Sequence, residues 1–423
     1  MTAGRASPAD GKRLGEKMSK KLKIGVVLVG LCALSLLLLS CGSSSSRPSG
    51  LLYVLTQGTS GSGNNVSSFS IDLNSGNLSL INSNATVCCG LPVSIVLDPT
   101  GATAFVLSQG GISAYPVNSD GSLGTQTNPW TVPAGDTAKA MTRDAAGNFL
   151  FVITQAPALY VFATTPGSTS LTLTGNDCPG TSTPCALPLT RIPSALSAIT
   201  LSTPAEEVLY VTSTQDLATT HNDNTLSVYV VGSDGTLTEK IGSPGSPYTT
   251  RTIDPLSVLA VNTNPAGEAT GGVFVYVGAA GNASGAIDVF QMCIVVNANC
   301  VQADVDDALL NAVGTPTSAG QKPVAMVVDP TNTFLYVVSE GTNQLFGFRI
   351  APAAGTLTPL STPNLPTGSQ PVALAMHSTG KFLYTSNSAA SNISGFTLST
   401  TSGAMSTPIT VTSPAGPSGM TAR

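Results

Sequence analysis

The sequence predicts an all-β fold, a seven-bladed β-propeller in which the C-terminal strand pairs into the N-terminal blade. Three observations predict it. A short aromatic–Val core recurs seven times, a second aromatic residue follows each core, and the chain ends in half a repeat. Self-similarity at a period of tens of residues is typical of repeat folds, and short strands at such a period are typical of propeller blades.

The two aromatic positions take up 14 of the 22 Phe, Tyr and Trp residues. The first position lies in the strand cores Tyr53-Val54, Phe105-Val106, Phe151-Val152, Tyr210-Val211, Tyr276-Val277, Tyr336-Val337 and, slightly altered, Tyr384-Thr385. The second position is held by Phe69, Tyr115, Phe162, Tyr229, Phe290, Phe348 and Phe396. The repeat, and not one central core, therefore places the aromatic side chains.

The first 40 residues have the features of an export signal. Three lysines between residues 20 and 23 precede an apolar run from Ile24 to Leu39, which ends in Leu-Leu-Ser-Cys at Cys41. A basic segment followed by an apolar run and small residues is the secretory pattern. The apolar run is shorter than the ~20 residues of a membrane-spanning helix, the alternative interpretation. Met18 would begin a signal of ordinary length, so residues 1–17 are interpreted as an extension ahead of the true start.

The Leu-Leu-Ser-Cys ending resembles the bacterial lipobox, in which the cysteine is lipidated and becomes the first mature residue. The resemblance implies that Cys41 carries the lipid. Residues 41–50 then form a flexible Ser-rich tether, and residues 51–423 form the propeller. We expect a protein held at the bacterial cell envelope by its lipid, on the periplasmic or the surface face.

Charged residues make up only 9% of the chain, and they become more acidic once the signal is removed. After residue 40 the chain holds 10 Lys and Arg against 20 Asp and Glu, a net charge of −10. Without a basic stripe, nucleic acid is not an expected partner. Strong helix formers such as Glu and Lys are sparse, which favours strands.

Six cysteines remain in the predicted domain. Cys178 and Cys185 share a spacing of seven with Cys293 and Cys300, and each pair interrupts a connection within its own blade. Because an exported compartment permits disulfides, two local bridges are predicted. The neighbouring residues 88 and 89 are left open as a vicinal bridge or two thiols. A metal site is disfavoured because no Cys-x-x-Cys spacing is present, and no cofactor is expected.

Blade six shows the expected order of strands. An inner strand over 323–328 ends in a turn at Asp329-Pro330, a core strand follows over 334–338, then a third strand over 345–350, and Gly355-Thr356-Leu357 opens the outer strand. The Asp-Pro pair suits a type I turn, since Asp accepts backbone N–H bonds and Pro fixes φ. Blades two and seven repeat the order, with Gly121-Ser122-Leu123 and Gly403-Ala404-Met405 opening their outer strands. Blades three to five carry insertions.

The two chain ends predict how the ring closes. Blade one begins at Leu51 with its second strand and has no inner strand of its own. Residues 417–423 align with the inner strand of blade seven, so they are expected to supply the missing strand and to remove the open edges of a linear array.

The repeated strand cores, such as Phe334-Leu335-Tyr336-Val337-Val338 and Phe382–Asn387, resemble those of the YVTN-repeat and lactonase-like β-propellers. The resemblance covers nearly all of residues 51–423 and implies a seven-bladed propeller. That family includes metal-independent 6-phosphogluconolactonases, which carry Gly-Pro-Arg-His at the start of inner strands. Here the equivalent positions read Gln-Lys-Pro-Val at 321–324, Ser-Gln-Pro-Val at 369–372 and Gly-Pro-Ser-Gly at 416–419, without the Arg-His pair.

Four residues are candidates for chemistry at the channel. His377 takes the turn position that Asp98, Asp144 and Asp329 hold in other blades, so it is interpreted either as a turn residue or as a general base near the rim. Lys139, Arg143 and Arg423 lie on inner strands, where they either bind an anion in the channel or form solvated strand ends.

Other polar and aromatic features are assigned structural roles. His221 lies in a polar insertion, an acidic cluster over 304–307 suits a helix N-terminus better than a calcium loop, and Trp130 is expected to anchor packing in the connection after blade two.

Two function classes follow from these features. The favoured one is a monomeric, lipid-anchored module that binds an envelope protein, a glycan or a small molecule through its faces and channel. The alternative is an exported lactonase-like hydrolase that uses His377, Arg143, Arg423 and Lys139; fold resemblance alone supports it.

Overall fold

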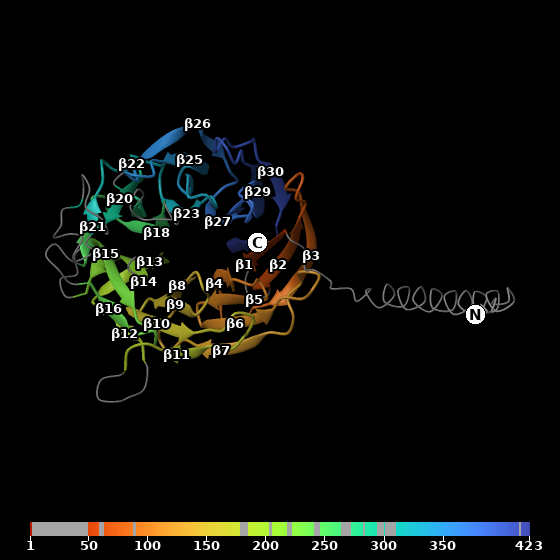
Figure 1. Ribbon diagram of the computed structural model, residues 1–423, viewed down its shortest axis with the longest axis horizontal. Helices are drawn as coiled ribbons and strands as arrows, with labels where there is room; N and C mark the ends of the chain where they lie inside the picture. Colours follow the sequence, from red (N-terminus) through yellow and green to blue (C-terminus); the bar gives the residue numbers. More distant parts are fainter. Residues whose placement is uncertain are drawn as a thin grey trace. The chain divides into compact units, whose positions relative to one another are not determined.

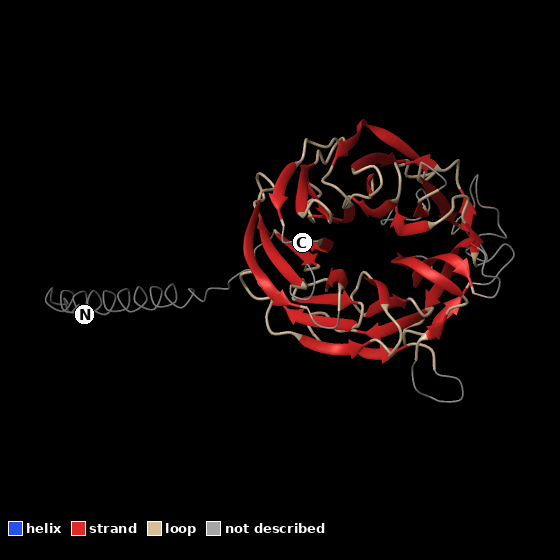
Figure 2. Ribbon diagram, turned by 180° about the vertical axis from the view of Figure 1, so that it is seen from behind, coloured by secondary structure: helices blue, strands red, loops and turns tan. Residues whose placement is uncertain are grey.

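Seven antiparallel sheets surround a central axis in the computed structural model of the chain (Figure 1). The structure describes residues 1, 50–58, 63–87, 90–177, 185–202, 205–217, 222–240, 246–263, 272–281, 284–293, 300, 310–413 and 416–423. All of these except Met1 belong to one compact unit, residues 47–423. The regular elements in these ranges are all strands (Figure 2), and none of these ranges contains a helix long and apolar enough to cross a membrane.

Each blade has an inner, a core, a third and an outer strand. In this order, blade one consists of β31 (Pro417–Ala422), β1 (Leu51–Thr56), β2 (Asn65–Ile71) and β3 (Leu78–Thr86), blade two of β4 (Pro92–Leu97), β5 (Thr103–Ser108), β6 (Gly111–Pro116) and β7 (Thr127–Thr131), blade six of β23 (Pro323–Val328), β24 (Phe334–Ser339), β25 (Gln344–Ile350) and β26 (Leu357–Pro366), and blade seven of β27 (Pro371–Met376), β28 (Phe382–Asn387), β29 (Asn392–Thr397) and β30 (Ile409–Thr412).

Blades three to five divide the outer position between two short strands that pair with different parts of the third strand. Blade three consists of β8 (Ala138–Arg143), β9 (Phe149–Thr154), β10 (Ala158–Ala163), β11 (Thr172–Thr174) and β12 (Leu187–Pro188), blade four of β13 (Arg191–Ser202), β14 (Ala205–Asp216), β15 (Asn222–Val231), β16 (Leu237–Glu239) and β17 (Tyr248–Thr249), and blade five of β18 (Pro255–Asn262), β19 (Val273–Ala279), β20 (Ala286–Met292), β21 (Leu310–Ala312) and β22 (Thr317–Ser318).

The C-terminal strand closes the ring, as the sequence predicts. β31 pairs antiparallel with β1, and Met420 lies opposite Val54. The seven inner strands contact one another in sequence around the axis, including β27 with β31 and β31 with β4. The sheet of blade one therefore contains the two ends of the propeller, and no inner strand is left without a neighbour on either side.

The apolar core is divided into seven clusters, one between each pair of adjacent blades. The cluster between blades seven and one includes Met420 from the closing strand with Val54 and Phe382. This confirms that the repeat distributes the aromatic side chains instead of collecting them in one core. The core strands of blades one, two, five, six and seven are buried along their whole length because blades cover both of their faces.

A tyrosine on the core strand of four blades donates a hydrogen bond to a glycine carbonyl oxygen of the next blade. The hydroxyl of Tyr336 lies 2.8 Å from the carbonyl oxygen of Gly403, and that of Tyr384 lies 2.8 Å from the carbonyl oxygen of Gly76. The other two bonds run from Tyr53 to Gly121 and from Tyr276 to Gly355. Since the bond from Tyr384 to Gly76 joins blade seven to blade one, it reinforces the closure of the ring.

Gly403 shows why the acceptor is a glycine. Its φ is +73°, and a Cβ added there would lie 2.5 Å from the ring of Phe334 in the preceding blade. The turn of one blade is thus packed directly on the aromatic core strand of the blade before it.

Two details of the predicted blades were wrong. In blades two and seven the chain after the glycine forms only single bridges, Val117 with Leu123 and Leu398 with Met405, and the outer strand begins later, at Thr127 or Ile409. Trp130 consequently lies within the outer strand β7 and not in the connection after it. Its ring centroid is 4.9 Å from that of Tyr160 in blade three, so the predicted packing role is confirmed.

One predicted disulfide is present, between Cys293 and Cys300 after β20. Cys178 lies outside the described residues, so its pairing with Cys185 stays a prediction. The same holds for the predictions on Cys41, His221, the paired cysteines at 88 and 89, and the acidic cluster at 304–307.

Candidate functional site

A cavity of about 470 Å³ opens where the inner strands end. Leu97 ends β4, Arg143 ends β8 and Ala422 ends β31, and all three line it. The inner strands all run in the same direction along the axis, which brings residues from distant parts of the sequence to one rim. Arg423 and Ser378 complete the polar part of the wall.

Arg143 is held at the cavity by backbone carbonyl groups. Its Nε donates to the carbonyl oxygen of Leu97 at 2.7 Å, and its Nη1 donates to those of Asp144 and Ala145 at 2.8 and 3.2 Å. Burial lowers the pKa of the guanidinium, and the carboxylates of Asp144 and Asp98 act in the opposite direction. The side chain stays charged, since arginine has a pKa far above neutral.

Arg423 reaches the same cavity from the closing strand. Its backbone is fixed to Leu51, whose N–H lies 3.2 Å from the Arg423 carbonyl oxygen. The guanidinium lies against Gly101, where an added Cβ would come within 2.5 Å of Nη1. Nη1 is buried and has no hydrogen-bond acceptor among the described residues. A buried guanidinium nitrogen without an acceptor is costly to the folded state.

Asp98 lines the cavity, but its oxygen atoms are already occupied. Oδ1 accepts from the Thr103 N–H at 2.7 Å, and Oδ2 accepts from the Thr100 hydroxyl at 2.5 Å and the Gly167 N–H at 2.7 Å. Burial raises the pKa of this carboxyl, and these hydrogen bonds outweigh burial and hold the pKa below its usual value. Asp98 is therefore an ionised turn residue and not a free base.

The other two candidates lie elsewhere. Lys139 is near the start of β8, four residues or roughly 13 Å along the strand from Arg143. Its Nζ donates to the carbonyl oxygen of Pro193 at 2.8 Å, and burial lowers its pKa. The structure thus brings Arg143 and Arg423 to one cavity and leaves Lys139 at the other end of its strand.

His377 occupies a turn. Its Nδ1 lies 2.8 Å from the Thr379 hydroxyl and 3.2 Å from the Thr379 N–H, and its side chain packs edge-on against Phe382. The N–H of His377 donates to the Phe382 carbonyl, as Asp98 does to that of Thr103. The residue is 2% exposed and does not line the cavity, although Ser378 beside it does. This geometry supports its interpretation as a turn residue.

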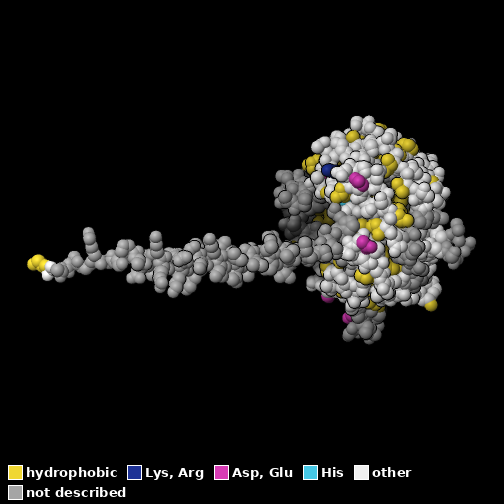
Figure 3. Space-filling view, turned by 90° about the vertical axis from the view of Figure 1, so that its right-hand side faces the viewer, with side chains coloured by type: hydrophobic (Ala, Val, Ile, Leu, Met, Phe, Trp, Pro, Cys, Tyr) yellow, Lys and Arg dark blue, Asp and Glu magenta, His cyan; other side chains and the backbone are white. Residues whose placement is uncertain are grey.

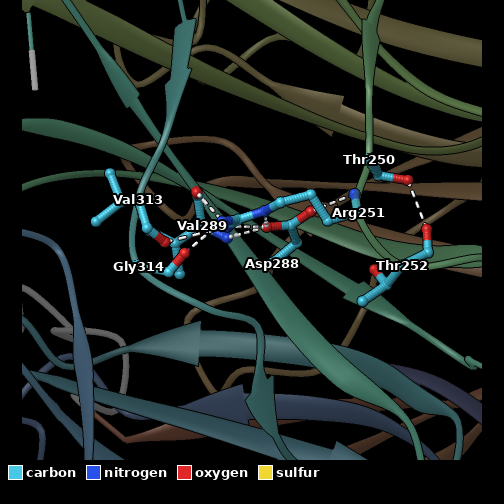
Figure 4. Close-up of polar contacts among 7 residues, drawn as sticks. All are labelled: Thr250, Arg251, Thr252, Asp288, Val289, Val313 and Gly314. Carbon is cyan, nitrogen blue, oxygen red and sulfur yellow. Dashed lines mark hydrogen bonds and ion pairs between the residues drawn. The ribbon is translucent and has the colours of Figure 1, made fainter.

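Arg251 and Asp288 form a charged pair that sequence reasoning missed (Figure 4). Nε of Arg251 lies 2.8 Å from Oδ1 of Asp288, and Nη2 donates to the same oxygen and to the carbonyl of Val313. The Asp288 side chain is fully buried. The donors of Arg251 and the carboxylate oxygens of Asp288 all have hydrogen-bond partners. The role of the pair is therefore to join the connection after blade four to the third strand of blade five.

Glu207 on β14 is a second titratable group that sequence reasoning missed. Its Oε2 accepts the Thr200 hydroxyl, and its Oε1 is buried without a partner among the described residues. Burial and, to a smaller extent, the charge of Asp144 raise the pKa of this carboxyl to about 7. Glu207 lies opposite Thr200 across the β13–β14 pair.

Uncharged side chains dominate the face of the propeller seen in Figure 3, where few Lys, Arg, Asp or Glu residues are visible. Among the described residues, no three His, Cys, Asp or Glu side chains gather in a way that could hold a metal ion.

Residues 274–422 match the family described as Lactonase, 7-bladed beta-propeller. The matched segment runs from the core strand of blade five to the closing strand. It contains Ser378 of the cavity, and it excludes Asp98 and Arg143 and stops one residue before Arg423.

The propeller as a whole has the fold of the lactonase-type seven-bladed propellers. The periplasmic gluconolactonase of Pseudomonas aeruginosa superposes with a TM-score of 0.63 at 17% sequence identity, over 88% of this chain and 98% of that one. A candidate 6-phosphogluconolactonase of Bacteroides fragilis superposes with a TM-score of 0.61 at 14% identity, over 89% and 98% of the two chains. No curated protein matches the chain. At these identities the lactonase-type likeness concerns the fold and leaves the activity to be argued from the cavity.

Proposed function

We propose that this propeller is an exported lactonase-like hydrolase that opens a sugar lactone in the cavity between Arg143 and Arg423. The observation that carries the proposal is the presence of two guanidiniums at one cavity in a chain whose residues 274–422 match the lactonase propeller family. Export rests on the signal and lipobox pattern ahead of Cys41. The similarity to a periplasmic gluconolactonase agrees with export from the cytoplasm.

The chemistry needs one water molecule. Its oxygen bonds to the carbonyl carbon of the lactone, the bond from that carbon to the ring oxygen breaks, and the ring oxygen receives one proton. The acid that forms loses its other proton to solvent. As water adds, negative charge grows on the carbonyl oxygen, and a guanidinium N–H directed at that oxygen stabilises the transition state. Nη2 of Arg143 and the guanidinium of Arg423 are the donors without a hydrogen-bond partner among the described residues.

Binding without hydrolysis is the second candidate function, and one observation favours it. The oxygen atoms of Asp98, the carboxyl group that lines the cavity, are engaged by Thr100, Thr103 and Gly167. The cavity therefore offers donors but no carboxylate prepared to take a proton from water. In this case the lipid-anchored propeller is a receptor at the envelope.

A hydrolysis assay separates the two functions. The compact unit 47–423 is mixed with glucono-1,5-lactone, and acid release is followed at constant pH against the spontaneous rate. Hydrolysis predicts a rate above buffer that Arg143→Met or Arg423→Met lowers roughly 100-fold, the usual effect of losing one oxyanion donor. Lys322→Met, at a side chain that is 57% exposed and outside the cavity, is the matched control and should keep the rate. A rate equal to that of buffer, or equal losses in all three variants, would reject the hydrolase.

A further inference from the structure

Among the described cations, some have a carboxylate within ion-pair distance and others do not. Arg251 lies against Asp288, Arg191 against Asp216, and Lys322 against Glu340. By contrast, Arg143 donates to three carbonyl groups and to no carboxylate, and no acceptor is present for Nη1 of Arg423 within the described ranges. Two cations thus face one cavity without an ion-pair partner within hydrogen-bond distance.

The neighbouring carboxylate cannot serve as that partner. Backbone and hydroxyl donors occupy both oxygen atoms of Asp98, and neither oxygen forms a hydrogen bond with the two guanidiniums among the described residues. A planar anion with two oxygen atoms matches the fork of N–H groups on a guanidinium. The two guanidiniums that line the cavity therefore suit an oxyanion as a ligand.

The surrounding charge limits how negative that anion can be. Asp98 and Asp144 both act on Arg143 through their negative charge. With two guanidiniums and two carboxylates nearby, a carboxylate monoanion is repelled less than a phosphate dianion. Ser378 and Thr421 add hydroxyl-bearing side chains to the wall, and these suit a ligand rich in hydroxyl groups. A volume of about 470 Å³ lies within the range of small-molecule sites.

We infer that the Arg143–Arg423 cavity binds the carboxylate of an open-chain sugar acid. The inference deepens the proposed function and rests on it, because a sugar acid is what lactone ring opening produces. The neutral lactone lacks the charge that the two guanidiniums select, so the product binds more tightly than the substrate. Turnover is therefore limited by product inhibition.

Calorimetric titration of the unit 47–423 with sodium gluconate tests the inference. Glucitol, which has a CH₂OH group in place of the carboxylate, is the matched neutral probe, and glucose 6-phosphate is the phosphate probe. Gluconate should bind, and more tightly than either of the other two probes. Arg143→Met or Arg423→Met should weaken gluconate binding at least tenfold, while Lys322→Met leaves it unchanged. Equal binding of glucitol, tighter binding of glucose 6-phosphate, or no effect of the arginine changes would overturn it.

Arg423 lies in the closing strand, so its replacement can unfold the ring. Arg423→Lys keeps the charge and the stem beside Gly101, and Arg143→Met leaves the closing strand intact. The two variants keep the test decisive if Arg423→Met does not fold. Gluconate binding that depends on arginine, together with no lactone hydrolysis, upholds the anion site and rejects only the hydrolase. Lactone hydrolysis without gluconate binding upholds the hydrolase and rejects the anion site.

Discussion

Removal of one hydroxyl group at the junction of blades seven and one should measurably weaken the propeller. Tyr384→Phe deletes the donor to the Gly76 carbonyl oxygen, 2.8 Å away and 308 residues earlier in the sequence. Gly76 is buried, so water cannot readily replace the lost donor. Phenylalanine at positions 105 and 151 shows that this place in the repeat accepts the ring without the hydroxyl.

The expected cost follows from the unpaired carbonyl. A buried acceptor left without its donor costs about 1–3 kcal/mol. Unfolding entropy of about 2.1 cal/mol/K per residue, over roughly 370 residues, converts this loss into a fall in Tm of about 1–4 °C. Tyr336→Phe removes the equivalent bond to Gly403 between blades six and seven and should cost a similar amount.

Thermal unfolding of the single and double variants, followed by circular dichroism, checks this reasoning. The two bonds share no residue, so their effects should add. Tyr160→Phe is the control, because the Tyr160 hydroxyl has no hydrogen-bond partner among the described residues and its ring packs against Trp130. If the Tm values of Tyr384→Phe and Tyr336→Phe equal that of the control, the hydrogen bonds between blades do not stabilise the ring.

Three further predictions concern the anchor, the closing strand and a buried carboxyl group. Cys41→Ala should leave an uncleaved or unanchored precursor, and fractionation that finds it processed and membrane-bound like the parent contradicts the lipobox. A chain that ends at Ser413 lacks β31, which removes Met420 from its apolar cluster at a cost of ~2–5 kcal/mol for that side chain alone. It should melt lower and associate more readily, whereas unchanged melting of a monomer excludes the role given to closure. Because the folded-state pKa of Glu207 is raised from 4.5 to about 7, stability from this group is lost as pH rises across that window. Glu207→Gln should therefore raise Tm at pH 8 and change it little at pH 4.5, and equal effects at the two pH values would contradict the burial argument.

The fold could be predicted from the sequence because each blade repeats the same local pattern. Tyr336-Val337 and its counterparts mark the core strands, and the half repeat at residues 417–423 indicates where the ring closes. The strands are short and their partners are mostly adjacent in sequence, so local pattern specifies most of the pairing. The outer strands were less predictable, since in blade two a single bridge at Leu123 separates the turn from β7.

The candidate site could be predicted only in part. Arg143 and Arg423 were recognisable as cations on inner strands, but their meeting at one cavity depends on the ring placing β8 of blade three and the closing strand on either side of β4. The burial of His377 in its turn likewise depends on contacts with Thr379 and Phe382.

The sequence by itself determined the seven blades, the order of strands within a blade and the strand that closes the ring, because these depend on a repeated local pattern. The tertiary structure alone decided which charged groups have an ion-pair or hydrogen-bond partner. Arg251 finds Asp288, Asp98 is occupied by backbone donors, and Arg423 is left facing a cavity. The physical reason is that charge pairing acts over a few ångströms in space, and only the closed ring sets those distances between residues hundreds of positions apart.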